Sequence, residues 1–197
     1  MGKGRLEAFS DGVLAIIITI MVLELKVPHD TGLGALRPLI PVFLSYLLSF
    51  VYLAIYWNNH HHMLHTCTHV TGRILWANLH LLFWLSLFPF VTGWMGENYT
   101  ASAPVALYGA VLLMAAIAYY ILQRAIIAGQ GAGSLLARAI GPDIKGKLSP
   151  LLYAGGMLAS LFELPVAHGI YVLVALMWLV PDRRIERALR AENVTGA

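Results

Sequence analysis

The sequence predicts an all-α integral membrane protein with six transmembrane helices, on the evidence of its composition, its apolar runs and its charge placement. The chain has 197 residues, of which 59% are hydrophobic and 12% charged, and its mean hydropathy is +0.73. A soluble domain is typically about 45–50% apolar and about 25% charged. Both departures favour a membrane protein, and we expect one six-helix domain over residues 1–197, embedded in a lipid bilayer.

Apolar runs able to cross a bilayer, which takes about 20 residues, follow one another along the chain. We predict helices over about 6–25, 38–57, 73–95, 103–127, 148–163 and 165–180. The last two come from one long apolar block that Glu163-Leu164-Pro165 interrupts. Pro89 is the only proline expected inside a span, so the third helix should kink there. The first run is too long for a signal peptide, so no cleavable leader is expected.

The positions of Lys and Arg predict the orientation of the helices. If the N-terminus is cytoplasmic, eleven of the thirteen Lys and Arg residues fall on the cytoplasmic side. Only Lys26 and Arg37 then lie outside. An even number of spans places the C-terminus in the cytoplasm as well.

The first helix differs from the others because it carries polar and ionisable residues in an apolar run. These residues are Arg5, Ser10, Asp11 and Thr19. Ionisable groups inside a membrane usually face the protein interior or water and are candidates for function. The alternative is that Arg5 and Asp11 form a structural pair that holds helices together.

Steps of three and four residues place one set of side chains on a single face of this helix. This first-helix stripe consists of Arg5, Phe9, Gly12, Ile16, Thr19, Ile20 and Leu23. Ile16 lies about 16 Å above Arg5, at a rise of about 1.5 Å per residue, and so near the bilayer centre. The stripe is compatible with ordinary helix packing and with an apolar ring around a pore where several copies meet.

The segment Arg5-Leu6-Glu7-Ala8-Phe9-Ser10-Asp11 resembles the R-x-x-x-F-S-D signature of the transmembrane protein 175 family of potassium channels. The similarity continues in Tyr56-Trp57-Asn58-Asn59-His60-His61 and in the third helix, with Trp76, Asn78, His80, Trp84 and Pro89-Phe90. The specific motifs lie in the first three helices, and the last three match only in hydropathy and spacing. The chain has one six-helix unit, like the bacterial members of the family.

The resemblance implies a weakly selective potassium channel of the bacterial plasma membrane. It implies a homotetramer whose pore is lined by the first helix, with an apolar constriction in place of a carbonyl filter. Ile16 matches the main constriction, Ile20 and Leu23 match apolar layers above it, and Thr19 matches a position proposed for ion selection. The expected partners are lipid, copies of the chain and monovalent cations. Potassium is the permeant ion, no cofactor is expected, and nucleic acid is not an expected partner.

The signature residues, Arg5 with Phe9, Ser10 and Asp11, are expected to form a packing and hydrogen-bond hub rather than an ion site. Ser10 and Asp11 point away from the first-helix stripe, so they need partners on other helices. We expect these partners among Asn78, His80 and Trp84. Glu24 ends the same helix and either raises the cation concentration at an outer mouth or is a solvated end residue near Lys26.

A histidine cluster suggests an alternative function as a metal-ion or proton-coupled cation transporter. It consists of His60, His61, His62, His65 and His69, close to Cys67. Spacings of four place His61, His65 and His69 on one helical face, where they are weak candidates for zinc or copper ligands. The other interpretation is a basic cap at the membrane surface that titrates near neutral pH.

A secondary transporter is the second rival, because Glu163 and His168 are candidates for a proton relay. The sequence shows no internal repeat of the kind typical of transporters, and Glu163-Leu164-Pro165 is more simply an outer turn. We expect no enzyme activity, since the sequence has no nucleophile elbow, paired carboxylates or H-E-x-x-H motif.

Overall fold

The computed structural model describes residues 2–131, 133–141 and 143–179, and in that part the chain is helical and contains no strand. The all-α class predicted from the sequence is therefore confirmed. The α-helices are α1 (Lys3–Met21), α2 (Ile40–His65), α3 (Gly72–Ser86), α4 (Phe88–Glu97), α5 (Ser102–Gln130), α6 (Leu135–Ile140), α7 (Ile144–Ala159) and α8 (Leu164–Leu179). Two 3₁₀ helices, Val22–Glu24 and Leu33–Leu39, extend the ends of α1 and α2.

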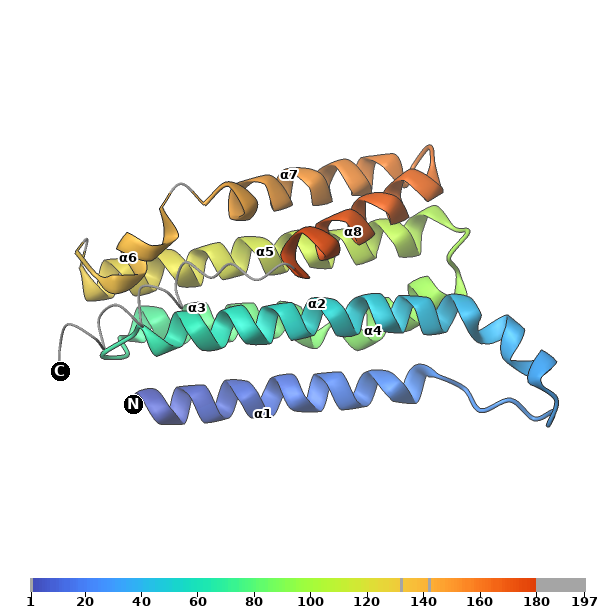
Figure 1. Ribbon diagram of the computed structural model, residues 1–197, viewed down its shortest axis with the longest axis horizontal. Helices are drawn as coiled ribbons and strands as arrows, with labels where there is room; N and C mark the ends of the chain where they lie inside the picture. The colour runs from blue at the N-terminus through green and yellow to red at the C-terminus, as the bar shows by residue number, and fades with distance from the viewer. Residues whose placement is uncertain (1, 132, 142, 180–197) are drawn as a thin grey trace.

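The long helices lie side by side, with α1 at one edge of the molecule and α7 at the opposite edge (Figure 1). α1 packs against α2, α3 and α4, whereas α7 packs against α5 and α8. α5 lies between the two groups and contacts α3, α4, α7 and α8. Within the described residues, only one side of α1 is therefore covered by other helices.

Among the residues that the structure describes, four helical segments are long and apolar enough to cross a membrane: Lys3–Glu24, Leu33–His65, Gly72–Glu97 and Ser102–Gln130. α8 is a shorter apolar helix of 16 residues. The chain is thus a multi-pass membrane protein by the length and composition of its helices.

Several helix ends differ from the sequence prediction. α2 does not stop near residue 57 but continues to His65, so the first four members of the histidine cluster are helical. The N-terminal part of α7 starts at Ile144 because Asp143 caps it and accepts a hydrogen bond of 3.2 Å from Gly146 N. Residue 180, the predicted end of the last helix, lies outside the described residues.

Two prolines mark places where the helices differ from the predicted spans. The third predicted span is divided at Leu87 into α3 and α4, and Pro89 occupies the first turn of α4, where its missing N–H costs least. Pro89 was the only proline expected inside a span, but Pro150 also lies inside a helix, α7. Its ring removes one backbone hydrogen bond there, which favours a bend.

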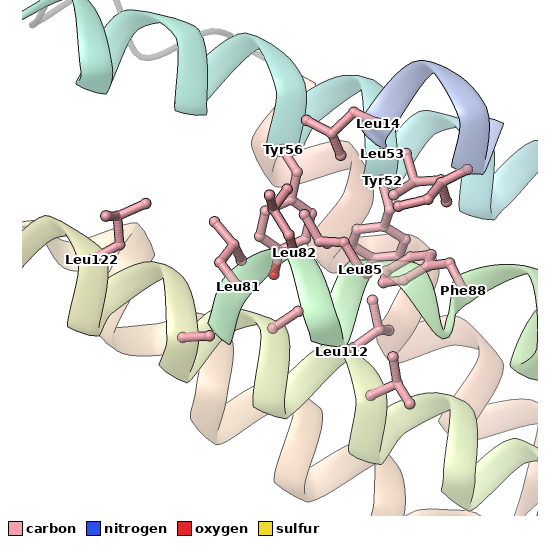
Figure 2. Packing of buried hydrophobic residues seen from close by; sticks show 14 of the residues in the cluster. Leu14, Tyr52, Leu53, Tyr56, Leu81, Leu82, Leu85, Phe88, Leu112 and Leu122 are labelled. Carbon is pink, nitrogen blue, oxygen red and sulfur yellow. The ribbon is translucent and has the colours of Figure 1, made fainter. Parts of the chain in front are cut away.

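The core is continuous through the bundle and combines leucines with large aromatic side chains. Figure 2 shows Leu14 of α1, Tyr52 and Leu53 of α2, and Leu81 and Leu85 of α3 gathered in one cluster. Tyr52, Tyr108 and Tyr171 are fully buried and keep hydrogen-bond partners. Because lipid offers no such partners, these bonds fix the positions of the rings.

Close helix approach at Tyr171 depends on small residues in the helices facing it. A Cβ on Gly156 of α7 would lie 2.5 Å from Tyr171 Cε1, whereas a Cβ on the neighbouring Gly155 would meet nothing within 4 Å. The Tyr171 ring cannot easily retreat, since its hydroxyl donates to Val105 O at 3.2 Å.

We expect Gly156→Ala to lower the thermal stability of the detergent-purified protein, because overpacking a filled core typically costs about 1–3 kcal/mol. Gly155→Ala is the matched control and should leave the melting temperature nearly unchanged. Equal melting temperatures for the two variants would contradict this prediction. They would mean that the Tyr171 ring can move aside for a methyl group on Gly156 at little cost in stability.

Candidate functional site

α1 has two faces of opposite character in the folded chain. Leu14 and Ile17 are buried against the neighbouring helices and expose 1% and 5% of their surface. On the other face Ile16 and Leu23 expose 58% and 75%. The whole first-helix stripe, consisting of Arg5, Phe9, Gly12, Ile16, Thr19, Ile20 and Leu23, is exposed in the single chain. The single chain therefore leaves this largely apolar stripe free to contact lipid or another protein chain.

Thr19 is the one hydroxyl in the upper half of the stripe. Its Oγ1 lies 3.0 Å from Ala15 O and 2.9 Å from Ile16 O, so its proton is donated back to the helix. This arrangement leaves the oxygen lone pairs directed away from α1 and able to accept a hydrogen bond or face a cation.

Acidic side chains gather where α1 meets the end of α4. A Cβ on Gly93 would lie 2.6 Å from Glu24 Oε2, so the Glu24 carboxylate rests on this glycine. Lys26 Nζ lies 2.5 Å from Glu97 Oε1, and this hydrogen-bonded carboxylate raises the pKa of Lys26 above its ordinary value. Lys26 is thus paired with Glu97, not with Glu24 as its neighbour in sequence.

The buried face of α1 is attached to α2 and α3 by a chain of hydrogen bonds. Asn78 Nδ2 donates to Ser10 Oγ at 2.9 Å, and Ser10 Oγ donates to Leu6 O at 2.8 Å. The amide oxygen of Asn78 lies 2.6 Å from His60 Nε2. Because the amide nitrogen faces Ser10, the oxygen faces His60, which must donate. This buried polar chain, His60–Asn78–Ser10, joins three helices, and Asn78 is 0% exposed.

A second bond at the same level involves the carboxylate of the signature. Trp57 Nε1 donates to Asp11 Oδ1 at 3.0 Å. One end of the helix is also fixed, since Lys3 Nζ donates to His65 O at 2.8 Å. α1 is therefore attached to α2 at its first turn and to both α2 and α3 two turns later.

Of the three hub partners named from the sequence, the structure brings Asn78 to Ser10 but pairs the other two with each other. Trp84 Nε1 donates to His80 Nε2 at 2.9 Å within α3. The expected contact of Asp11 with α3 is replaced by Trp57 of α2. Arg5 and Phe9 are exposed on the stripe and not part of the buried chain.

Sequence reasoning missed Trp57 and His60 as hub residues. Both lie in the Tyr56–His61 segment that resembled the family, but the histidines there suggested metal binding. The signal that was available is the spacing of three between Trp57 and His60, which places them on one face of α2. That face is the one turned toward α1.

The histidine cluster does not converge on one point. His60 turns inward to Asn78, while the rings of His61 and His65 continue a stack that begins at Trp57 beside α1, with successive ring centroids 6.2 and 6.1 Å apart. His69 lies beyond the end of α2, which corrects the expectation of a shared helical face. Within the described part of the chain, no three His, Cys, Asp or Glu residues are grouped to hold a metal ion.

The proton-relay candidates Glu163 and His168 flank the start of α8, and the His168 ring nitrogen Nδ1 lies 2.8 Å from Leu164 O within that helix. Glu163 belongs to the turn between α7 and α8, where its carbonyl accepts from Val166 N and Ala167 N. Both residues take part in the backbone hydrogen bonding at the start of α8, and these contacts do not favour a proton relay.

Comparison with known proteins gives consistent matches. Residues 5–89 match the family described as Endosomal/lysosomal potassium channel TMEM175. A potassium channel of Chryseobacterium sp. (strain P1-3) is 56% identical over 190 residues, which cover 96% of this chain and 99% of that protein. A potassium channel of Streptomyces collinus is 33% identical over 125 residues, covering 59% of this chain and 61% of the relative.

A solved structure matches over nearly the whole chain. It is the crystal structure of a lysosomal potassium-selective channel TMEM175 homolog from Chamaesiphon minutus. The two folds agree with a TM-score of 0.81 at 28% sequence identity, over 91% of this chain and 97% of that one.

We expect Asn78→Leu to lower the thermal stability by the cost of an orphaned buried polar group, about 1–3 kcal/mol. The variant leaves His60 without its partner, whereas Ser10 keeps Leu6 O. The double variant Asn78→Leu/His60→Leu should recover part of the loss, because it removes the orphan. Scanning fluorimetry of the purified protein measures both, with Asn98→Leu at an exposed amide as the control. A loss no larger than that of the control would contradict the role given to the chain.

Proposed function

The chain belongs to the TMEM175 family of potassium channels, and from this premise we propose that it conducts potassium ions across a membrane through a pore lined by α1. The potassium-channel relatives support the activity, because one of them matches at 56% identity over almost its full length. The multi-pass helical fold supplies the membrane-embedded frame that such an activity requires. The permeant ion is the only ligand this function needs.

In the proposed topology the chain crosses a bacterial plasma membrane six times, with both ends in the cytoplasm. The crossings are α1, α2, α3 with α4, α5, α7 and α8. The placement of Lys26 and Arg37 outside and the other Lys and Arg residues inside supports this orientation. α7 and α8 have 16 residues each, about 24 Å of helix, so they are the shortest crossings.

The observation that carries the proposed pore is the exposure of the first-helix stripe. One chain contributes one such helix, so a pore lined by it needs several copies around an axis. We propose a homotetramer, the assembly that the resemblance to single-repeat bacterial channels implies. The attachment of the opposite face of α1 to α2 and α3 supports this arrangement, because it directs the stripe away from its own chain.

In the proposed pore Ile16 forms the narrowest apolar ring, with Ile20 and Leu23 in layers above it. A ring of apolar side chains stops ions by excluding water and passes them when it widens. Thr19 supplies the hydroxyl oxygen in this stretch, which supports a weak preference among monovalent cations. Glu24, resting on Gly93 at the outer end, adds negative charge that raises the local cation concentration.

We expect Ile16→Asn to raise potassium flux into proteoliposomes and to reduce the preference for potassium over sodium. A polar ring holds water where an apolar ring excludes it. A tenfold rise in flux corresponds to a barrier lower by about 1.4 kcal/mol. Separate potassium and sodium gradients measure the two quantities.

Leu173→Asn is the control for this experiment, because Leu173 of α8 is exposed to a similar degree, 56% against 58%. This variant should conduct like the wild type. The proposal fails if neither wild type nor Ile16→Asn conducts while the protein is folded and oligomeric, or if both variants change flux equally.

We expect Asp11→Ala to reduce the assembled fraction of the protein before it changes ion selectivity. The reason is that Asp11 accepts from Trp57 and does not belong to the exposed stripe. Size-exclusion chromatography with light scattering measures assembly, and flux per assembled channel measures selectivity. Asp30→Ala, in the exposed loop before α2, is the control. Normal assembly with altered selectivity would place Asp11 in the ion path.

A further inference from the structure

An open groove lies on the surface of the bundle where α3 and α5 pack side by side (Figure 1). It holds about 550 Å³ of space, within the range of small-molecule sites, about 300–1,000 Å³. Its lining includes Arg73, Trp76, Ala77 and His80 of α3 and Ile121 and Ala125 of α5. We call it the α3–α5 groove. None of the described residues that line it belongs to α1, so an occupant of this groove does not enter the proposed pore.

The α3–α5 groove lies at the end of the bundle where α3 begins and α5 ends. A Cβ on Gly129, in the last turn of α5, would lie 3.3 Å from Ile74 and 3.6 Å from Thr71 at the start of α3. The two helices are therefore antiparallel here. Ala125 and Ile121, about one and two turns earlier in α5, lie closer to the bilayer centre. In the proposed topology the mouth of the groove faces the cytoplasmic leaflet.

Two exposed arginines flank this mouth. Arg73 lines the groove near the start of α3, and Arg124 directly precedes the lining residue Ala125 on α5. Arg124 follows Ile121 by three residues and so shares its exposed face of the helix. Within the part of the chain that the structure describes, no hydrogen bond, ion pair or ring contact joins either guanidinium to another residue. A guanidinium binds a phosphate group through two parallel N–H bonds, so this mouth suits a phosphate.

The deeper part of the groove combines an exposed aromatic ring with one hydrogen-bond donor. Trp76 exposes 73% of its surface, as a residue of an interfacial aromatic belt does. His80 is half-buried, and its Nε2 accepts from Trp84 Nε1 at 2.9 Å. In the neutral ring the proton is therefore on Nδ1, and no described residue accepts it. From its mouth inward the groove thus offers two cations, an apolar wall and one donor.

Charge distinguishes the two occupants that can reach a groove on the membrane-facing surface, a lipid and a second copy of the chain. A second copy would have to present a carboxylate to the two arginines. The described carboxylates on this side belong to Glu7, Asp11 and Asp143, and each already has a partner in its own chain. The cytoplasmic leaflet, in contrast, carries anionic phospholipids, which basic residues at the membrane surface attract. The charges therefore favour a lipid.

We propose that the α3–α5 groove is a binding site for an anionic glycerophospholipid. The lipid phosphate lies between Arg73 and Arg124, and an acyl chain lies along Trp76 and Ile121. An ester carbonyl, the acceptor that follows the phosphate in such a lipid, accepts the Nδ1 proton of His80. The site rests on the proposed orientation of the chain and is independent of the pore.

Native mass spectrometry of the full chain in detergent micelles tests this site, with dioleoyl phosphatidylglycerol as the probe. A titration gives the affinity and the number of lipids bound per subunit. Dioleoyl phosphatidylcholine is the neutral comparison, because it has the same chains and a phosphate but no net charge. An excess of inorganic phosphate, added as a competitor, separates a lipid site from a site for the free anion. No step of this experiment depends on ion conduction.

The variants Arg73→Gln and Arg124→Gln each remove one charge from the mouth of the groove. Both arginines are exposed in the folded chain, so their loss should leave the melting temperature nearly unchanged. Lys147→Gln is the matched control, because Lys147 of α7 is an exposed cation on the same side of the membrane and lies outside the groove.

The expected result is one phosphatidylglycerol per subunit, bound about tenfold more tightly than phosphatidylcholine and retained in excess phosphate. Each arginine variant should weaken phosphatidylglycerol binding about fivefold, the effect of one basic residue at an anionic membrane surface. The double variant should bind the two lipids alike, and Lys147→Gln should bind like the wild type.

Three outcomes would overturn the proposal. The first is equal affinity of the folded wild type for the two lipids, or no binding of phosphatidylglycerol. The second is displacement of phosphatidylglycerol by inorganic phosphate, which would show that the site recognises the free anion. The third is equal weakening by Lys147→Gln and the two arginine variants, which would show that only the total charge of the chain matters.

Discussion

The buried polar chain His60–Asn78–Ser10 is the constraint on which the arrangement of α1 depends. A polar side chain in the hydrocarbon region has no water to turn to, so its partner must come from another helix or from its own backbone. Ser10 reaches Asn78 at only one rotation of α1 about its axis. Asp11, one residue later, meets Trp57 of α2 at that same rotation. Two bonds to two helices therefore determine which face of α1 is covered and which is left open.

The exposed face of α1 follows from this rotation of the helix. With Leu6, Ser10, Leu14, Ile17 and Met21 turned inward, the opposite side of α1, which carries the first-helix stripe, is left uncovered by the described part of the chain. The lipid-like character of the stripe gives little preference between lipid and another copy of the chain, since lipid tails are as apolar as leucine. The Thr19 hydroxyl within the stripe and the carboxylate of Glu24 next to it, beside Gly93, are what distinguish it from a purely lipid-facing surface.

α2 contacts helices on both sides of the bundle, including α1, α4 and α8. Trp57 bonds Asp11 of α1 and His60 bonds Asn78 of α3, while the Tyr56 ring meets Tyr119 of α5 with centroids 6.1 Å apart. Tyr119 of α5 also donates to Asn59 O at 3.4 Å. α2 is therefore fixed on one side to α1 and on the other to α5.

The sequence by itself determined the all-α class, the membrane setting and the composition of the first-helix stripe, because run length and helical period depend only on local geometry. It also identified Ser10 and Asn78 as residues in need of partners. Only the tertiary structure decided that Asp11 pairs with Trp57, that His60 turns inward while His61 and His65 stack outside, and that α3 and α4 are separate helices. These outcomes depend on the rotation and offset of neighbouring helices, which are set by the packing of many side chains together and leave no periodic signal in one segment.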